Sequence, residues 1–128
     1  MNRLVVVDTS VFVNFLQGKA GEALSVLILN NQVLLSQVVR LELLAGVGQR
    51  DARTLNSLLA SLRCLEDFPP PEPCIKLLDK VKAKGRFGGV ADLLILADTI
   101  RRQAVLFTHD QKLAILAKQL AVPVMTSA

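Results

Sequence analysis

The sequence predicts an α/β sandwich in which helices cover both faces of a mainly parallel central sheet. Short runs of β-branched and aliphatic residues alternate with longer amphipathic segments along the whole chain. This alternation is typical of parallel sheets, because two parallel strands need a long crossover connection, which is usually a helix. No internal repeat or linker interrupts the pattern, so we expect a single domain over residues 1–128.

Glycine and small polar residues mark the element boundaries in the first half of the chain. Thr9 or Ser10 can cap the first helix, and Gly18 can end it. Gly46 and Gly48 close the third helix. In order, the expected elements are a strand over residues 4–7, helices over 10–16 and 21–29, a strand over 33–36, and helices over 38–45 and 51–62.

Proline and glycine divide the second half in the same way. Three consecutive prolines at residues 69–71 stop a short strand, since proline lacks the backbone N–H that a strand needs. Gly85 ends the next helix, and Gly88 and Gly89 precede a strongly apolar one. In order, the expected elements are a strand over residues 64–68, helices over 72–84 and 90–102, a strand over 104–108, a helix over 110–120 and a strand over 122–125.

The composition is apolar for so small a chain. Hydrophobic residues make up 52% of the 128 residues and the mean hydropathy is +0.44, which suggests that a partner covers some apolar surface. The apolar runs are far shorter than the roughly 20 residues of a membrane span, and no signal-peptide pattern opens the chain. Cys64 and Cys74 have neither disulfide-framework nor metal-ligand spacing. We therefore expect a cytoplasmic protein with reduced thiols and no membrane segment.

Basic residues dominate the charge and cluster before residue 87. The net charge is +4 and the isoelectric point is about 9.4. The cluster comprises Lys76, Lys80, Lys82, Lys84 and Arg86. It indicates either a solvated helix face or a surface that binds a polyanion. The five Phe residues are the only aromatic ones, so a base-stacking platform is not expected, and phosphates and shape would be the features recognised.

Four acidic residues stand at unusual positions in this pattern. Asp8 and Asp110 follow predicted strands, at the sheet edge where open α/β sheets form ligand crevices. Glu42 and Asp92 lie within apolar helices, where a carboxylate must be paired, neutral or bound to a cation. Helix caps can explain the first pair, and arginine partners can explain the second. As a set, four carboxylates without a matching His or Cys cluster favour a hard cation such as Mg²⁺ or Mn²⁺.

Other chemistries lack their motifs. The chain has no G-x-G-x-x-G, Walker A or G-x-S-x-G sequence. A haloacid-dehalogenase-like phosphohydrolase would need a second acid two positions after Asp8, where this chain has Ser10. The single histidine, His109, could touch a phosphate, but a surface loop is its simpler interpretation. Asp98 is about 120° around the helix from Asp92, so we expect it to face elsewhere.

The ordered set of acids resembles that of PIN-domain ribonucleases. The motifs are Asp8 in "VVVDTSVFVNFL", Glu42 in "VVRLELLAG", Asp92 in "GGVADLLILAD" and Asp110 in "LFTHDQKL", and they extend over nearly the whole chain. The size and basic charge are similar to those of the toxins of VapBC-type toxin-antitoxin pairs. The resemblance implies a PIN-like three-layer α/β/α sandwich and an endoribonuclease that depends on Mg²⁺ or Mn²⁺. It also implies a homodimer that a small antitoxin protein holds inactive.

The resemblance also implies a role for each matched residue. The catalytic set would be Asp8, Glu42, Asp92 and Asp110, of which Asp8, Asp92 and Asp110 would hold the metal. Ser10 and Thr108 would support them, Ser10 by holding Asp8 or a metal-bound water. RNA backbone contacts would come from the basic cluster, at Lys82, Lys84 and Arg86.

A function of a different class remains open at this point. The chain could be a catalytically silent PIN-like module whose role is to bind another protein, with its acids kept for the fold or for a partner's arginine. The apolar helices over residues 23–29 and 55–62 would then form the main contact surface. Such a module would have no activity for EDTA to remove.

Overall fold

The described strands form one parallel sheet. The computed structural model describes residues 3–19, 21–46 and 49–125. The strands within these ranges are β1 (Val5–Val7), β2 (Val33–Leu35), β3 (Arg63–Cys64), β4 (Val105–Phe107) and β5 (Val124–Met125). They are arranged in the order β3-β2-β1-β4-β5, and each neighbouring pair is parallel. The predicted parallel sheet is therefore confirmed.

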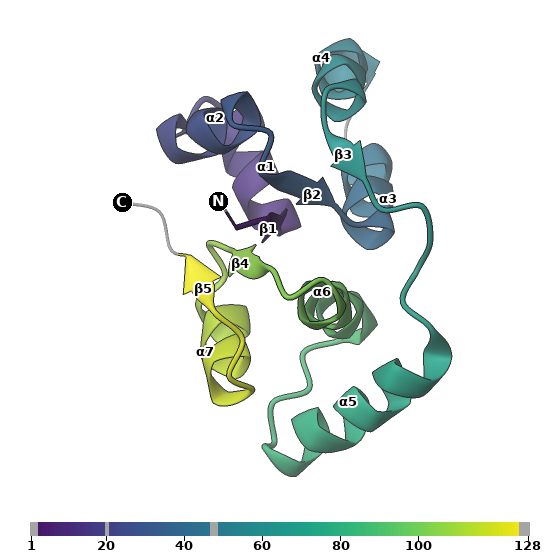
Figure 1. The fold of residues 1–128 in the computed structure, drawn as a ribbon. Coiled ribbons are helices and arrows are strands. Elements are labelled where there is room, and N and C mark those ends of the chain that lie inside the picture. Colours follow the sequence, from purple (N-terminus) through teal and green to yellow (C-terminus); the bar gives the residue numbers. More distant parts are fainter. Residues whose placement is uncertain (1–2, 20, 47–48, 126–128) are drawn as a thin grey trace.

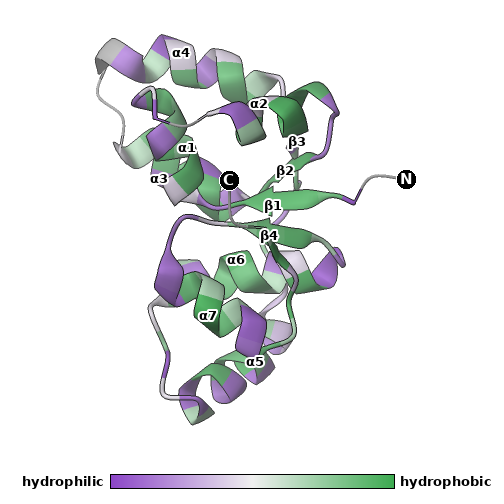
Figure 2. Cartoon of the chain, turned by 90° about the vertical axis from the view of Figure 1, so that its left-hand side faces the viewer, coloured by the Kyte–Doolittle hydropathy of each residue, from purple (hydrophilic) through white to green (hydrophobic). Residues whose placement is uncertain are grey.

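Helices cover both faces of this sheet. Those of the described residues are α1 (Thr9–Leu16), α2 (Glu22–Leu29), α3 (Gln37–Gly46), α4 (Gln49–Ala60), α5 (Pro71–Ala83), α6 (Val90–Arg101) and α7 (Gln111–Gln119). Figures 1 and 2 show α1 to α4 on one side of the strands and α5 to α7 on the other. Right-handed crossovers explain this division, because the chain moves outward from β1 in one direction as far as β3 and then in the other as far as β5. The three-layer sandwich is thus also confirmed.

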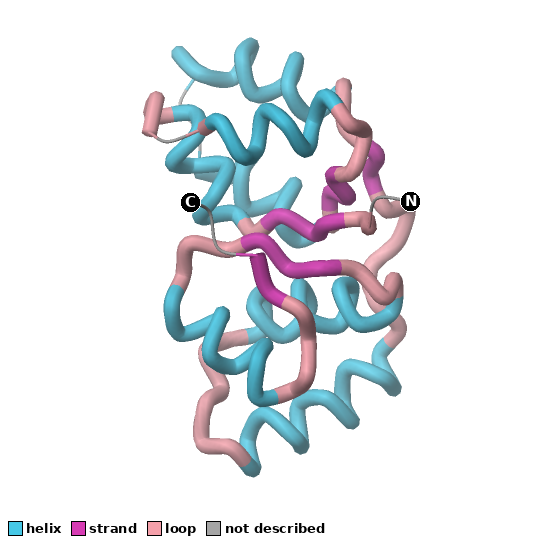
Figure 3. Tube along the Cα trace, turned by 60° about the vertical axis from the view of Figure 1, so that its left-hand side comes forward, coloured by secondary structure: helices cyan, strands magenta, loops and turns pink. Residues whose placement is uncertain are grey.

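The strands are almost entirely apolar because helices cover both of their faces. Val6, Val7 and Leu106 are fully buried, together with Phe12 of α1. Figure 2 shows the strands as the most hydrophobic part of the chain, and Figure 3 shows them between two groups of helices. Continuous apolar runs of this kind are expected in parallel strands that are buried on both sides. Within the described residues, no helix is both long and apolar enough to cross a membrane.

Several predicted boundaries and caps are wrong in detail. β3 is Arg63–Cys64 instead of residues 64–68, and Pro71 opens α5 at a position where its missing N–H costs nothing. Neither Thr9 nor Ser10 caps α1, since both hydroxyls have other partners. The predicted stop at Gly48 lies outside the described residues.

The leucine face of α4 also differs from the predicted contact surface. Leu55 is fully buried, and Leu58, Leu59 and Leu62 pack partly against the core. In contrast, Leu29 and Val26 of α2 are exposed. Of the two apolar helices that could have formed a contact surface, only α2 leaves large side chains open to solvent.

A buried ion pair links α6 to the segment before α5. The carboxylate of Asp98 is completely buried, and Arg101 donates to it at 3.0 Å and to Asp67 at 3.2 Å. Burial raises the pKa of Asp98, while the hydrogen bond from Arg101 acts against this shift. The charged groups that act on Asp98 are Arg101, Asp67 and Arg102, and none of them is one of the four candidate acids.

We expect Arg101→Ala to destabilise the protein much more than Arg102→Ala. The first change leaves a buried carboxylate without its cation, which costs about 3 kcal/mol of unfolding free energy. The second removes an exposed side chain that forms no ion pair within the described residues, and its effect should stay within about 0.5 kcal/mol. Urea denaturation of both variants measures the difference. Equal losses would show that the pair does not support the fold.

Candidate active site

The carboxyl ends of β1 and β4 lie side by side at the point where the chain reverses its direction across the sheet. Val7 pairs with Phe107, and the N–H of Asp8 donates to the carbonyl oxygen of Phe107 at 2.9 Å. Asp8 and Thr108 are therefore neighbours just beyond the last paired residues. Ligand sites of doubly wound sheets form at this kind of position.

Two hydroxyl groups hold the carboxylate of Asp8. Oδ2 of Asp8 accepts from Ser10 Oγ at 2.7 Å and from Thr108 Oγ1 at 2.8 Å. Each hydroxyl also accepts a backbone N–H from the turn after β4, Ser10 from His109 at 3.1 Å and Thr108 from Asp110 at 3.0 Å. The start of α1 and the turn after β4 are thereby joined through one buried carboxylate, which is 5% exposed. The other oxygen, Oδ1, accepts no hydrogen bond from the described residues.

Asp110 caps α7, so the interpretation of this acid as a helix cap is confirmed. Its Oδ1 accepts from the backbone N–H of Lys112 at 2.9 Å and of Leu113 at 3.2 Å. These bonds satisfy N–H groups that have no partner within the helix. They occupy one oxygen and leave Oδ2 for another ligand, so a capping role and a binding role are compatible.

Asp92 lies in the first turn of α6 and is half-buried among the other acids. Burial raises the pKa of Asp92 to about 6, and the charges of Asp8, Asp110 and Glu42 add to the shift. The backbone of the preceding loop is close, since a Cβ at Gly88 would stand 3.0 Å from Oδ2 of Asp92. The charges of the other three acids thus act on Asp92 in addition to its burial, so the four acids share one electrostatic environment.

Glu42 is more accessible than its apolar neighbours in the sequence suggested. Its side chain is exposed, as are those of Leu41 and Leu44, so the expected burial of this acid is wrong. Thr9 donates to Oε1 of Glu42 at 2.6 Å, which ties α3 to the residue after Asp8. An arginine partner, the other interpretation of Glu42 and Asp92, is not found among the described residues.

Sequence reasoning missed two polar residues of α1. Thr9 holds Glu42, and the amide nitrogen of Asn14 lies 2.6 Å from Nδ1 of His109. His109 also meets the ring of Phe107 edge-on, with centroids 5.6 Å apart, so it is packed in place at the site. Asn14 was the detectable signal, because a polar residue within the apolar run "VFVNFL" needs a partner.

The donor chemistry of the four acids fits a hard divalent cation, although the side chains do not stand close enough to enclose one. The donor atoms that these four side chains offer are carboxylate oxygens, which Mg²⁺ and Mn²⁺ prefer as ligands. Across the described ranges, no group of three or more His, Cys, Asp or Glu side chains stands in an arrangement that could hold a metal ion as it is. Like charges repel one another, and a bound cation would offset this repulsion.

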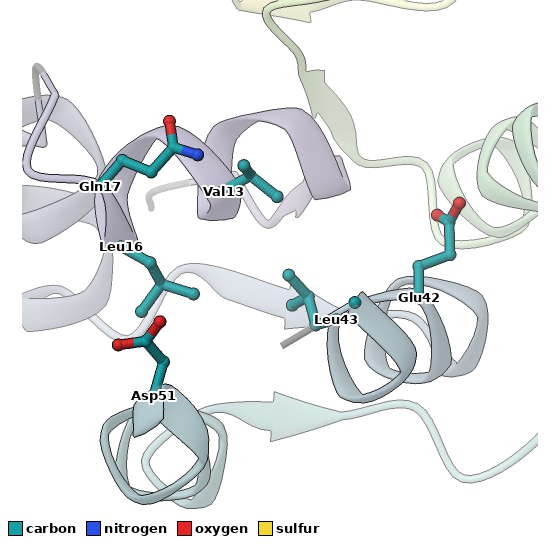
Figure 4. Close-up of a pocket in the computed structure, with 7 residues that line it drawn as sticks. Val13, Leu16, Gln17, Glu42, Leu43 and Asp51 are labelled. Atoms are coloured by element: carbon teal, nitrogen blue, oxygen red, sulfur yellow. The ribbon is translucent and has the colours of Figure 1, made fainter. Parts of the chain in front are cut away.

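A pocket of about 180 Å³ opens beside Glu42, between α1, α3 and α4 (Figure 4). Val13, Leu16 and Leu43 give it apolar walls, and Glu42 and Asp51 add carboxylates at its opposite sides. An apolar cavity with an acidic rim suits a ligand that has apolar and basic groups.

A family model for the PIN domain matches residues 5–119. None of the curated proteins matches the chain. The fold is similar to that of a chain in VapBC2 from Rickettsia felis bound to a DNA fragment from its promoter. The two are 21% identical, with a TM-score of 0.76 and with 98% of this chain and 99% of that chain covered.

Two further solved structures have the same fold. A chain of DNA-bound VapBC from Salmonella typhimurium is 16% identical, with a TM-score of 0.82 and 98% of each chain covered. A chain of FitAcB from Neisseria gonorrhoeae is 21% identical, with a TM-score of 0.70 and with 95% of this chain and 96% of that chain covered. The similarity therefore extends over nearly the whole length of the chain.

The pKa of Asp92 predicts how stability depends on pH in EDTA. In the folded chain the carboxyl group of Asp92 keeps its proton up to about pH 6, whereas in an unfolded chain an Asp releases its proton at about pH 3.9. The stabilisation from the protonated form is complete below the unfolded value and is lost as the pH rises through the folded value. We expect Asp92→Asn to melt several degrees above the wild type at about pH 7.5 and to lose this advantage by about pH 4.

The matched control for this measurement is Asp79→Asn, which changes an exposed acid of α5. It should shift the melting temperature equally little at both pH values. An advantage of Asp92→Asn that does not change with pH would contradict the assigned cause.

Proposed function

The chain belongs to the PIN domain family, and from this premise we propose that it is a metal-dependent endoribonuclease, the toxin of a type II toxin-antitoxin pair. The observation that carries the proposal is the raised pKa of Asp92 beside three further carboxylates, at the switch point of the sheet. Perturbed acids in such a position are typical of functional sites. Family membership also argues against a haloacid-dehalogenase-like phosphohydrolase.

In this proposal Asp8, Asp92 and Asp110 would hold Mg²⁺ or Mn²⁺, with Asp8 using Oδ1 and Asp110 using Oδ2, the oxygens that their hydrogen bonds leave open. Such a cation lowers the pKa of a bound water and offsets negative charge on the scissile phosphate. Glu42 is the residue that positions or deprotonates the attacking water. Because Thr9 occupies Oε1 of Glu42, Oε2 is the atom that would accept the proton.

Ser10 and Thr108 keep the first ligand in position. Their hydroxyls fix Oδ2 of Asp8, so that Oδ1 is presented in one orientation. The phosphodiester backbone of the RNA would be held by Lys82, Lys84 and Arg86, which are all exposed around the end of α5 and the loop before α6. Contacts of this kind weaken steeply with salt.

RNA cleavage in the presence of Mn²⁺ tests the assignment. We expect Asp92→Asn to lower the cleavage rate by roughly 100-fold or more, because it removes a ligand charge. Thr108→Val should lower it by about 10-fold, because it loosens Asp8 without removing a ligand. Asp79→Asn is the control and should cleave at the wild-type rate. If a folded Asp92→Asn variant cuts as fast as the wild type, the assignment is wrong.

The competing function is a catalytically silent interaction module. The observation in its favour is that, within the described residues, the acids do not form a ready metal site. Treatment with EDTA separates the two functions. The nuclease loses activity and regains it with Mn²⁺, whereas the silent module cleaves no RNA under either condition.

The proposed partners are a small antitoxin protein and a second copy of the chain, in the cytoplasm where the RNA is found. The pocket supports the first partner, because its apolar walls and its two carboxylates match a segment with apolar and basic side chains. A segment seated there would also cover Glu42 and so block the site. Dimerisation with a second copy of the chain remains a prediction, which a measurement of molecular mass by light scattering tests.

Val13→Glu should release the chain from its antitoxin without stopping RNA cleavage. Val13 is 38% exposed on the pocket wall, so a charge there disrupts the contact surface and not the core. Val26→Glu is the control, since Val26 is 50% exposed on α2 and does not line the pocket. Growth is measured with each variant co-expressed with the proposed antitoxin protein. Growth arrest by Val13→Glu alone is the expected result, and equal growth of both would contradict this partner surface.

A further inference from the structure

The loop between α5 and α6 brings a phenylalanine to the edge of the acidic site. Because a Cβ at Gly88 would stand 3.0 Å from Oδ2 of Asp92, the loop backbone lies directly against this carboxylate. Phe87 is the residue immediately before that contact. Its side chain is 45% exposed, so an aromatic ring is open to solvent at this loop.

Two glycines with positive φ stand at the two ends of this loop. Gly85 at the end of α5 has φ +67°, and Gly89 at the start of α6 has φ +123°, both conformations that L-residues rarely adopt. The connection between these two glycines contains only Arg86, Phe87 and Gly88. Phe87 is therefore one residue away from the point where the loop backbone meets Asp92.

The fold gives no reason for the exposure of Phe87. It does not belong to the core cluster, and the only aromatic ring pair among the described residues is Phe107 with His109. The neighbouring cations, Lys84 and Arg86, are also exposed. The loop that contacts Asp92 at Gly88 therefore carries an exposed aromatic ring directly after two exposed cations.

From this arrangement we propose that Phe87 stacks on a nucleobase of the substrate next to the scissile phosphate. The assignment rests on the proposed nuclease function and adds a base contact to it. Cations hold phosphates and an aromatic ring holds the flat face of a base, so the two together bind a single strand whose bases are unpaired. This single ring provides the base contact that the aromatic composition alone did not predict.

The chain contains a closely matched control in Phe68. Its exposure is 48%, nearly that of Phe87, but it follows Asp67, which is bonded to Arg101 in the last turn of α6. Asp92 lies in the first turn of the same helix. Phe68→Ala therefore removes an equally exposed ring at the opposite end of α6.

The test uses a single-stranded RNA of about 12 nucleotides, and it measures KM and kcat with Mn²⁺ and Kd in EDTA. We expect Phe87→Ala to raise KM, and the Kd measured in EDTA, by about 10-fold with little change in kcat, because a lost base stack weakens binding. Phe87→Trp should bind as tightly as the wild type, and Phe87→Leu should resemble the alanine variant. Phe68→Ala should stay within about twofold of the wild type.

An abasic nucleotide, placed at each position in turn, identifies the stacked base. At one position the abasic nucleotide should weaken RNA binding by the wild type by the same factor of about 10. At that position it should not weaken binding by Phe87→Ala any further. A merely structural ring would show no such position. Melting temperatures and light scattering accompany each variant, so that unfolding or a change of oligomeric state is detected.

The outcomes distinguish a failure of the stacking role of Phe87 from a failure of the proposed nuclease function. If the wild type cleaves RNA and Phe87→Ala has the same KM and Kd, the stacking role is overturned and the nuclease function stands. A change in oligomeric mass with unchanged RNA binding overturns it too, and identifies the ring as a contact between copies of the chain. If the wild type cleaves no RNA with Mn²⁺, both proposals fail.

Discussion

The hydrogen-bonded carboxylate of Asp8 is the interaction on which the candidate site depends. It accepts from Ser10 and Thr108 at 2.7 and 2.8 Å, and both hydroxyls accept in turn from the backbone after β4. The start of α1 and the start of α7 are therefore positioned relative to each other through a single group. Asp110, which caps α7, takes its place from the same arrangement. The hydrogen bonds of the buried acid Asp8 thus help to position both Asp8 and Asp110.

Helix α6 shows how the surroundings of an acid divide structural roles from functional ones. Asp98 is completely buried, but Arg101 compensates its charge at a distance of 3.0 Å. Asp92, on the same helix, meets three further carboxylates and no ion-pair partner among the described residues. The first arrangement stabilises the packing of the helix. The second costs stability at neutral pH, and a cost of this kind is the expected trade-off at a functional site.

The sequence alone predicted the sheet, its helical layers and the order of the four acids, because hydrophobic periodicity and the ends of strands are local features. It did not predict the exposure of Glu42, since the apolar residues around it, Leu41 and Leu44, are themselves exposed. Nor did it predict that Thr9 and Ser10 bind side chains instead of capping α1. A hydroxyl at a helix start has several possible partners, and the choice depends on segments that are distant in sequence.

The sequence by itself determined the fold class, the family and which carboxylates are candidates for a metal, because each depends on residue type and spacing along the chain. That these acids share one electrostatic environment was decided by the strand order β3-β2-β1-β4-β5, which makes β1 and β4 neighbours although about 100 residues separate them. The close approach of the loop backbone at Gly88 to Asp92 was also decided by the tertiary structure. The physical reason is that electrostatic and stacking energies depend on distance in space, which only the packing of the folded chain sets.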